Sequence, residues 1–506
     1  MAVKLEKLTL PSVPEIESLE PSALVCLAKE WRERLEYYQG LLFRANKKQF
    51  GTSSERSPKT DQPSTPPADA GNNPGTPKTP KPRSKTTKQL SERYPDAPIQ
   101  IEPVGFTELP CCPECGKTMQ DSGMTEDCEY LTTEPKEYIV IRQKRAKHRC
   151  GKCHSSILTA PSPARIIPGG TYSDDMIIDA TLSKFCDLIP MERYCQMAAR
   201  RGLLGLPPHS LIVASMKLAS FLEAVYKRIK SETLNTEVLL ADETPHRMLE
   251  GDAKTKWYLW GFSSQKSCFF ECHNTRSGDV STAVLMESVC LFLLSDVYAG
   301  YGRSLRLANE IRAEKNLTAI IAAFCNAHAR RKFKDRDSAE VCEDAEWMVE
   351  RYKEIYKLNK EAKDEPSKVV IEKRAEMQPI FEAMREEAMK KINSYSSKSR
   401  MADAYNYFIE NYEGLTRFLD NHLIPIDNNQ SERLLRSHVV GRKTWYGTHS
   451  KRSAETAAVH FSIVESCKMI GVNPRDFYMD AVRRVHGKLD PLTPSEFREL
   501  RTSNTC

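Results

Sequence analysis

The chain has 506 residues, of which 28% are charged and 40% hydrophobic, and its formal net charge is +6. This length exceeds what one hydrophobic core serves, so we expect three or more folded units. The apolar runs are far shorter than the roughly 20 residues of a membrane helix. The N-terminus lacks the basic and apolar regions of a secretion signal. We therefore expect a cytoplasmic protein without a membrane partner.

Two segments precede the cysteine-rich region. Residues 1–56 are expected to be helical, because apolar residues between Leu24 and Leu42 repeat at alternating spacings of four and three. This stripe fits a coiled-coil dimer and fits equally a helix that packs on its own domain. Residues 57–89 are rich in Pro, Thr and Lys and contain no large apolar residue. They predict a disordered linker, whose lysines either contact DNA phosphates or are simply solvated.

Residues 90–165 contain two Cys-x-x-Cys pairs, Cys112 with Cys115 and Cys150 with Cys153. Two such turns present four thiolates in the number that a tetrahedral zinc site requires, so we expect a zinc ribbon with one structural Zn²⁺. A closed four-thiolate shell leaves no open position for catalysis. The alternative is redox-active or merely buried cysteine. Three nearby side chains are substitute ligands: Cys111, His148 and His154.

Residues 166–235 predict a helical domain that is a candidate for DNA binding. The stretch 173–188 opens with Ser173 followed by two acids, which is typical of a capped helix start. Residues 209–232 predict one long amphipathic helix. The break between them permits a helix-turn-helix, although many helical bundles share this pattern.

Residues 236–334 predict a mixed α/β sheet. Strand-like runs occupy 236–242, 256–264, 267–274, 289–296 and 317–329, and helical patterns occupy 277–288 and 304–314. The first strand is expected to end at Asp242, because Thr244 and Pro245 follow, and the fourth ends at Asp296. If these strands are neighbours, both carboxylates could bind one divalent metal ion.

The rest of the chain is expected to be mostly helical. Residues 335–420 are dense in charge with helical periodicity, which predicts a helical block. Residues 421–485 contain a helix that Asp427 or Asn428 caps and that carries Glu432 in its first turns. Glu432 and Arg436 are four residues apart, so spacing alone favours a surface ion pair. Residues 486–506 are expected to be a C-terminal tail.

Several motifs resemble a known family when taken in order. They are "FGTSSERS", "CPECGK" with "CGKC", "LLADETP", "LLSDVYAGY", "AFCNAHARRKF" and "DNNQSERLLRSHVVGRKTWYG". Together they resemble the transposases of the bacterial insertion sequence 66 family over nearly the whole chain. The sequence departs from the family at "RKTWYGTHS", where the family more often has Asn and Phe. This departure leaves the motifs of the acids intact and affects the expected detailed contacts with DNA.

The resemblance implies an RNase H-like catalytic domain with an Asp-Asp-Glu triad formed by Asp242, Asp296 and Glu432. The fold class is then multidomain α+β, in which 236–334 and 421–485 form the catalytic core and 335–420 is a helical insertion. The triad would hold two Mg²⁺ (or Mn²⁺) ions, since hard ions prefer carboxylate oxygen. Water would first free a 3′-hydroxyl at the transposon end, and this hydroxyl would then attack target DNA. Glu243 would point to the opposite face of the strand.

The resemblance also places further residues near the site and on DNA. "CNAH" resembles a Cys-x-x-His signature near the active site of several transposase groups, which puts Cys325 and His328 beside the metal. Arg330 and Arg331 would meet scissile phosphates, whereas solvated or core roles are the alternatives. The DNA-binding candidates are cations and aromatic residues that suit phosphates and unstacked bases. They are Arg436, Arg442, Lys443, Trp445, Tyr446, Lys451 and Arg452.

The predicted function is therefore a transposase that cleaves DNA and joins strands. Its expected partners are the terminal inverted repeats, target DNA, a second copy of the chain on paired ends, and helper proteins of the same element. We expect it at the bacterial nucleoid. The alternatives are an RNase H-like nuclease without strand transfer and a non-catalytic zinc-ribbon DNA-binding protein.

Overall fold

The structure is a computed structural model. It describes residues 20, 90–93, 99, 101, 118, 136–149, 157–249, 256–334, 343–363, 365–396 and 399–503. The four cysteines of the expected zinc ribbon, the apolar stripe of the N-terminal helix and the whole linker 57–89 lie outside these residues. The chain divides into two compact units, residues 53–140 and the remainder. The second of these carries the elements discussed below, apart from the short helix α3 (Leu90–Arg93).

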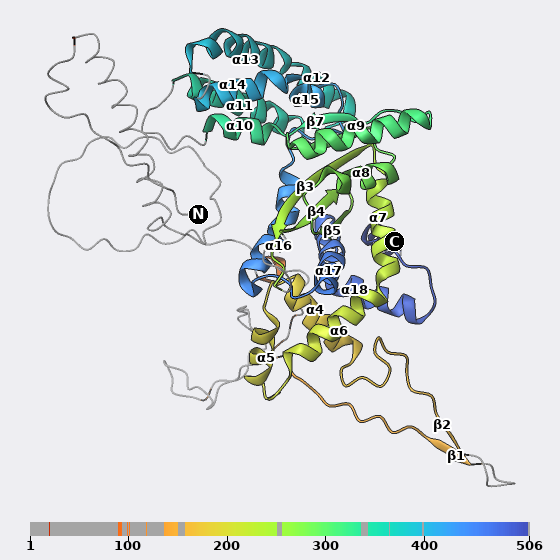
Figure 1. The fold of residues 1–506 in the computed structure, drawn as a ribbon. Helices are drawn as coiled ribbons and strands as arrows, with labels where there is room; N and C mark the ends of the chain where they lie inside the picture. Colours follow the sequence, from red (N-terminus) through yellow and green to blue (C-terminus); the bar gives the residue numbers. More distant parts are fainter. Residues whose placement is uncertain are drawn as a thin grey trace. The chain divides into compact units, whose positions relative to one another are not determined.

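A five-stranded mixed sheet forms the centre of this unit (Figure 1). Its strand order is β5-β4-β3-β6-β7. Strands β3, β4 and β5 are antiparallel neighbours, whereas β6 and β7 run parallel to β3. The strands are β3 (Val238–His246), β4 (Trp257–Ser263), β5 (Cys268–His273), β6 (Phe292–Ser295) and β7 (Ile321–Phe324). The predicted mixed sheet is thereby confirmed.

Two predicted strand ends were wrong. β3 does not stop at Asp242 but continues to His246. Beyond Leu240 the described residues pair β3 with β4 alone. Pro245 has no N–H group, and it is tolerated here because no described strand lies along the other edge of β3 at this point. β7 is much shorter than the predicted strand 317–329. It ends at Phe324, and helix α10 (Asn326–Lys334) begins within the "CNAH" stretch.

One face of the sheet is covered by α8 (Gly278–Glu287) and α9 (Ala299–Glu314). Their apolar residues pack on the alternate strand positions that include Leu239, Ala241 and Leu293. Both helices lie close to their predicted positions, and Ser277 caps α8 by accepting the N–H of Asp279.

The opposite face, on which Leu240 lies, is divided between two groups of helices. Helices α16 (Asn429–Trp445) and α17 (Lys451–Met469) pack over β4 and β5. The helical block that follows β7 packs over β3, β6 and β7. Its elements are α10, α11 (Glu343–Glu361), α12 (Ser367–Ala375), α13 (Gln378–Lys391), η1 (Ile392–Ser394), α14 (Arg400–Glu410), α15 (Tyr412–Thr416) and η2 (Arg417–Leu419). The two groups meet above the carboxyl ends of β6 and β7.

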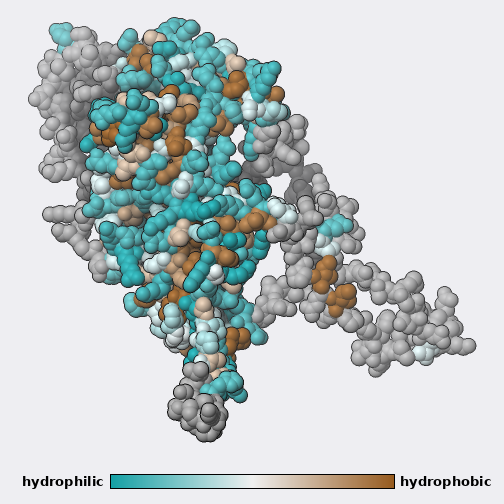
Figure 2. Space-filling model, turned by 90° about the vertical axis from the view of Figure 1, so that its right-hand side faces the viewer, coloured by the Kyte–Doolittle hydropathy of each residue, from teal (hydrophilic) through white to brown (hydrophobic). Residues whose placement is uncertain are grey.

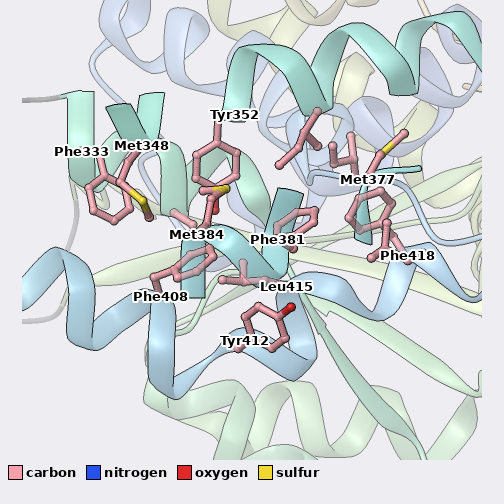
Figure 3. Close-up of a cluster of buried hydrophobic side chains, with 14 of the residues drawn as sticks. Phe333, Met348, Tyr352, Met377, Phe381, Met384, Phe408, Tyr412, Leu415 and Phe418 are labelled. Carbon is pink, nitrogen blue, oxygen red and sulfur yellow. The ribbon is translucent and has the colours of Figure 1, made fainter. Parts of the chain in front are cut away.

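The helical block has a large aromatic core of its own (Figure 3). Phe381 and Phe408 stack at 6.5 Å, and Tyr352 meets both rings edge-on. The same core includes Leu240 and Leu294 of the sheet. The block is therefore fixed to the strands that carry Asp242 and Asp296 rather than tethered loosely beside them.

The remaining helices form a second core on the side of α17. They are α4 (Asp174–Phe185), α5 (Met191–Ala199), α6 (Pro208–Phe221), α7 (Glu223–Leu234), α18 (Pro474–His486) and α19 (Pro494–Ser503). Ser173 caps α4 as predicted. The expected single helix 209–232 is instead two, α6 and α7, which meet at the buried residue Leu222. Phe497 of α19 is buried in the same core, so the expected tail contains a packed helix.

On the face shown in Figure 2, the surface of the described residues is mostly hydrophilic and carries scattered hydrophobic patches. Among the residues that the structure describes, no helix combines the length and apolar character that crossing a bilayer requires.

Gly261 of β4 allows α16 to lie close to the sheet. It is the cross-strand partner of Asp242, and a Cβ atom there would stand 2.9 Å from the ring of Phe270 and 3.4 Å from Leu435 of α16. We expect Gly261→Val to destabilise the protein by about 1–3 kcal/mol and to reduce activity by moving α16. Urea unfolding and DNA cleavage check this. Gly302→Ala, where a Cβ meets nothing within 4 Å, is the control; equal effects of both changes would contradict the expectation.

Candidate active site

Three parallel strands bring their side chains to one level of the sheet. Leu240 of β3 is in register with Leu294 of β6, so Asp242 and Asp296 each lie two positions further along. Ser295 of β6 is in register with Phe324 of β7, so Cys325 follows at the level of Asp296. Because side chains alternate along a strand, Asp242 lies on the same face as Leu240. This is the face on which the two groups of helices meet.

Asn428 fixes the start of α16 against this level of the sheet. Its side-chain amide donates to the carbonyl oxygen of Ala241 at 2.9 Å, and its backbone N–H donates to the sulfur of Cys325 at 3.1 Å. These bonds set the first turn of α16, which carries Glu432, directly against β3 and β7. Sequence reasoning weighed Asn428 only as a helix cap. Its side chain makes no capping bond in the structure.

Glu432 thereby lies near enough to Asp242 and Asp296 for their charges to interact. Asp242 is largely buried, and its carboxylate accepts the N–H of Glu243 at 2.9 Å. Burial, together with the charges of Glu243, Asp296 and Glu432, raises the pKa of Asp242 to about 8. The structure thus brings the three acids of the expected triad close enough to interact electrostatically.

Cys325 and His328 also lie beside Glu432. One ligand atom from each of these three residues lies within 4.8 Å of the others. His328 Nε2 is 3.5 Å from Glu432 Oε1, whereas His328 Nδ1 is buried without a hydrogen-bond partner. Burial raises the pKa of the Cys325 thiol to about 11, although backbone N–H groups of Asn428, His328 and Ala327 act in the opposite direction.

The two arginines of α10 have different surroundings. Arg331 is exposed, and its guanidinium donates to both oxygens of Glu432 at 3.3 and 3.4 Å. Arg330 instead lies 5.6 Å from the centre of the Tyr356 ring. Arg331 is therefore the one that contacts the acid cluster.

Glu243 lies on the opposite face of β3 from Asp242. Its side chain is only 3% exposed and accepts hydrogen bonds from Tyr301 at 2.6 Å and from Arg276 at 2.6 and 2.8 Å. The Arg276 guanidinium stacks 4.0 Å from the centre of the Tyr298 ring. The backbone N–H of Tyr298 donates to the Asp296 carboxylate at 3.1 Å. This network, which sequence reasoning missed, connects the backbone around Asp242 to the turn that holds Asp296.

We expect Tyr301→Phe to lower DNA cleavage by about 10–100-fold, the usual range for a residue that orients a metal ligand. Without the phenolic O–H, Glu243 loses one bond and β3 loses part of its fixed position. Cleavage rates at several Mg²⁺ concentrations check this, with a shift toward higher Mg²⁺ requirement expected. Tyr258→Phe is the control on the same sheet. A Tyr301→Phe protein that cleaves like the wild type would exclude this role.

The expected DNA-binding residues lie along the second half of α16 and the start of α17. Arg436, Lys443, Tyr446, Lys451 and Arg452 are exposed, and Tyr446 is 68% exposed. Trp445 is different. Its ring packs edge-on against Phe185 of α4, and the Lys184 ammonium lies 4.7 Å from it. Trp445 therefore has a packing role within the fold.

Two buried histidines connect the end of β3 to the middle of α16. His246 Nδ1 is 3.1 Å from His438 Nε2, and His246 Nε2 is 2.6 Å from the Thr448 hydroxyl. His438 Nδ1 has no partner. A bare nitrogen there is less costly than an unpaired N–H, so we assign the His438 Nε2–H as the donor to His246. Burial and the nearby charge of Arg442 lower the pKa of His246 to about 4.

The chain matches known proteins over the region that builds this site. Residues 169–456 match the family model described as "Transposase IS66 family". The uncharacterized protein y4jD of Sinorhizobium fredii is 26% identical over 411 residues, which are 78% of each chain. The uncharacterized protein y4hP of the same organism is 24% identical over 426 residues, which are 80% of this chain and 75% of that protein.

Proposed function

Because the chain belongs to the IS66 family of transposases, we propose that it cleaves the ends of its element and joins them to target DNA at Asp242, Asp296 and Glu432. The observation that carries this proposal is that the three acids lie near enough for their charges to interact. They come from β3, from the residue after β6 and from α16, which are distant in the sequence. Such a set of carboxylates on rigid elements is what metal-assisted phosphodiester transfer requires.

We also propose that the catalytic domain is RNase H-like. Three antiparallel strands followed by two parallel strands on the far side of β3, with helices on both faces, support this. The helical block between α10 and α16 would then be an insertion into that domain.

The donor set fits hard divalent ions such as Mg²⁺ or Mn²⁺, because it consists of carboxylate oxygens. The raised pKa of Asp242 supports this fit, since an acid buried among other carboxylates holds a proton that a cation would displace. When bound, a pair of such ions would polarise the scissile phosphate and activate the attacking water or 3′-hydroxyl.

The chain's own residues position the reacting groups. Asp242 and Asp296 hold their carboxylates on adjacent parallel strands, while Asn428 holds the Glu432 turn against them. The exposed Arg331 guanidinium beside Glu432 would bind a DNA phosphate that enters the site. The exposed cations from Arg436 to Arg452 continue from the site along α16, a helix of 17 residues and about 25 Å in length.

The second candidate is a nuclease that cleaves without joining. Purified protein, labelled element-end DNA and a target plasmid in Mg²⁺ distinguish the two, with and without helper proteins of the element. We expect labelled ends joined to the plasmid. Cleaved ends that are never joined would support the nuclease, and products that persist with Asp296→Ala would exclude the proposed triad.

For the residues outside the described part of the chain, we propose that Cys112, Cys115, Cys150 and Cys153 hold one structural Zn²⁺. The short hairpin of β1 (Lys147–Arg149) and β2 (Ile157–Thr159), which flanks the second cysteine pair, supports this proposal. Metal analysis of the purified protein tests it. We expect about one zinc ion per chain and its loss in Cys112→Ser.

A further inference from the structure

We propose that Cys325, His328 and Glu432 form a second metal site, specific for thiophilic divalent ions of the zinc class, and that an ion bound there inhibits the enzyme. The inhibitory half of this proposal rests on the proposed catalytic role of Glu432. The binding half stands on the geometry alone.

The three donors already stand near the spacing of a metal shell. A tetrahedral zinc ion with bonds of about 2.0–2.3 Å holds its ligand atoms roughly 3.3–3.8 Å apart. His328 Nε2 and Glu432 Oε1 are separated by 3.5 Å, and all three donor atoms lie within 4.8 Å of one another. A movement of about 1 Å by two partly exposed side chains would close the set around an ion.

The surroundings of the donors favour an ion. The Cys325 sulfur accepts the Asn428 N–H at 3.1 Å, a bond that orients the sulfur and offsets part of the cost of burying a thiolate. The Nδ1 atom of His328 is buried without a hydrogen-bond partner, so the ring makes fewer hydrogen bonds than buried polar groups usually do. Cys325 is fully buried, whereas the His328 and Glu432 side chains are 26% and 30% exposed, which leaves a path for entry.

The donor types separate this site from the carboxylate cluster. Sulfur and imidazole nitrogen select zinc, cobalt and cadmium, whereas Mg²⁺ prefers oxygen ligands. Arg331 is the competing cation at Glu432. Its contacts of 3.3 and 3.4 Å are long and exposed, so an ion displaces them at little energetic cost.

Both sites include Glu432, so an ion bound at one site limits how the Glu432 carboxylate can bind an ion at the other. An ion held by Cys325 and His328 competes with ions of the carboxylate site for the Glu432 oxygens. Micromolar Zn²⁺ is therefore expected to inhibit Mg²⁺-supported cleavage, and more Mg²⁺ should relieve the inhibition only partly.

The binding test uses full-length protein loaded with a single equivalent of zinc, which fills the predicted four-thiolate ribbon and leaves the second site free. Titration with Co²⁺ is followed by the thiolate-to-cobalt absorption band. We expect one additional equivalent in the wild type and none in Cys325→Ser, with binding at least tenfold weaker in His328→Gln. Cys290→Ser, which changes another fully buried cysteine on the opposite face of the sheet, should bind like the wild type.

Equal stoichiometry in the wild type and Cys325→Ser would overturn the proposal. If Cys325→Ser does not fold, the partly exposed His328→Gln decides, and unchanged cobalt affinity there overturns it. In the activity test, zinc inhibition is expressed relative to each variant's own zinc-free rate. We expect at least a tenfold higher half-inhibiting concentration in His328→Gln. Zinc binding without any inhibition would refute the sharing of Glu432, and absence of all activity would count against the proposed function instead.

Discussion

Replacing Asp242 with Asn is expected to abolish DNA cleavage and, at the same time, to stabilise the metal-free protein at pH 8. An amide cannot take the place of a carboxylate at a divalent ion, and losing about 4 kcal/mol of transition-state stabilisation lowers the rate about 10³-fold. The stabilising effect has a separate origin. The folded-state pKa of Asp242 is about 8, against an ordinary value of 3.8, because the group is buried among other carboxylates.

The sign of the pH effect follows from that shift. The folded protein keeps a proton on Asp242 that the unfolded chain releases, so stability falls as pH rises from about 4 through 8. A neutral Asn removes this loss. The difference in free energy of unfolding, Asp242→Asn minus wild type, should therefore be roughly 1–3 kcal/mol more favourable at pH 8 than at pH 5.5. Urea unfolding at both pH values and a cleavage assay measure the two effects.

Asp279→Asn is the matched control, because Asp279 is an exposed acid on α8. It should change neither the cleavage rate nor the pH dependence of stability. Residual cleavage by Asp242→Asn above about 1% of the wild-type rate would contradict the catalytic assignment. A stability difference that does not grow between pH 5.5 and 8 would contradict the electrostatic one.

Acidification from pH 6.5 to 4 is expected to lower the protein's stability through three buried histidines. Burial lowers the pKa of His246 and His460 to about 4 and that of His438 well below its usual value. The unfolded chain takes up these protons near pH 6.5, whereas the folded protein resists until about pH 4. The contribution of these histidines is therefore fully present above pH 6.5 and is lost as pH falls through this window, by about 3 kcal/mol per histidine at most. The opposite effect of Asp242 over the same pH range offsets part of this loss. Domains of this kind have only about 5–15 kcal/mol in total.

Urea unfolding at pH 7, 5.5 and 4.5 measures this loss. His460→Gln should flatten the decline, whereas His449→Gln, at an exposed position, should leave it unchanged. His460 contacts the Tyr478 hydroxyl at 2.8 Å, so some stability will also be lost at pH 7, and the slope with pH is the quantity to compare. Identical slopes in the wild type and His460→Gln would rule out this histidine as a source of acid sensitivity.

Elements with strong local signals could be predicted from the sequence. The Ser173 cap, the aromatic strands β4 and β5 and the helix after Ser277 are set by neighbouring residues, and their positions agree with the prediction. The three acids were named from motif resemblance, since strand-end acids and an ion-pair spacing are common. That Asp242 and Asp296 lie at the same level of the sheet follows only from the register of β3 and β6.

Features that depend on distant partners could not be predicted. β3 passes through Pro245 because β4 pairs with it and β6 does not, which no local pattern indicates. The break at Leu222 has neither Pro nor Gly to mark it. The hydrogen bond from Asn428 to Ala241 and the bond from Tyr301 to Glu243 join residues 187 and 58 positions apart. The surroundings of the acids therefore had to come from the structure.

The bond between Asn428 and Ala241 also has a consequence for synthesis of the protein. Because these residues are 187 positions apart, a ribosome that makes roughly 5–20 residues per second needs about 10–40 s between the two. During that interval the nascent chain carries Asp242 and Asp296 without Glu432. A chain that terminates early within the helical block would thus lack the third acid, and under the proposed function such an incomplete translation product would be unable to cleave DNA.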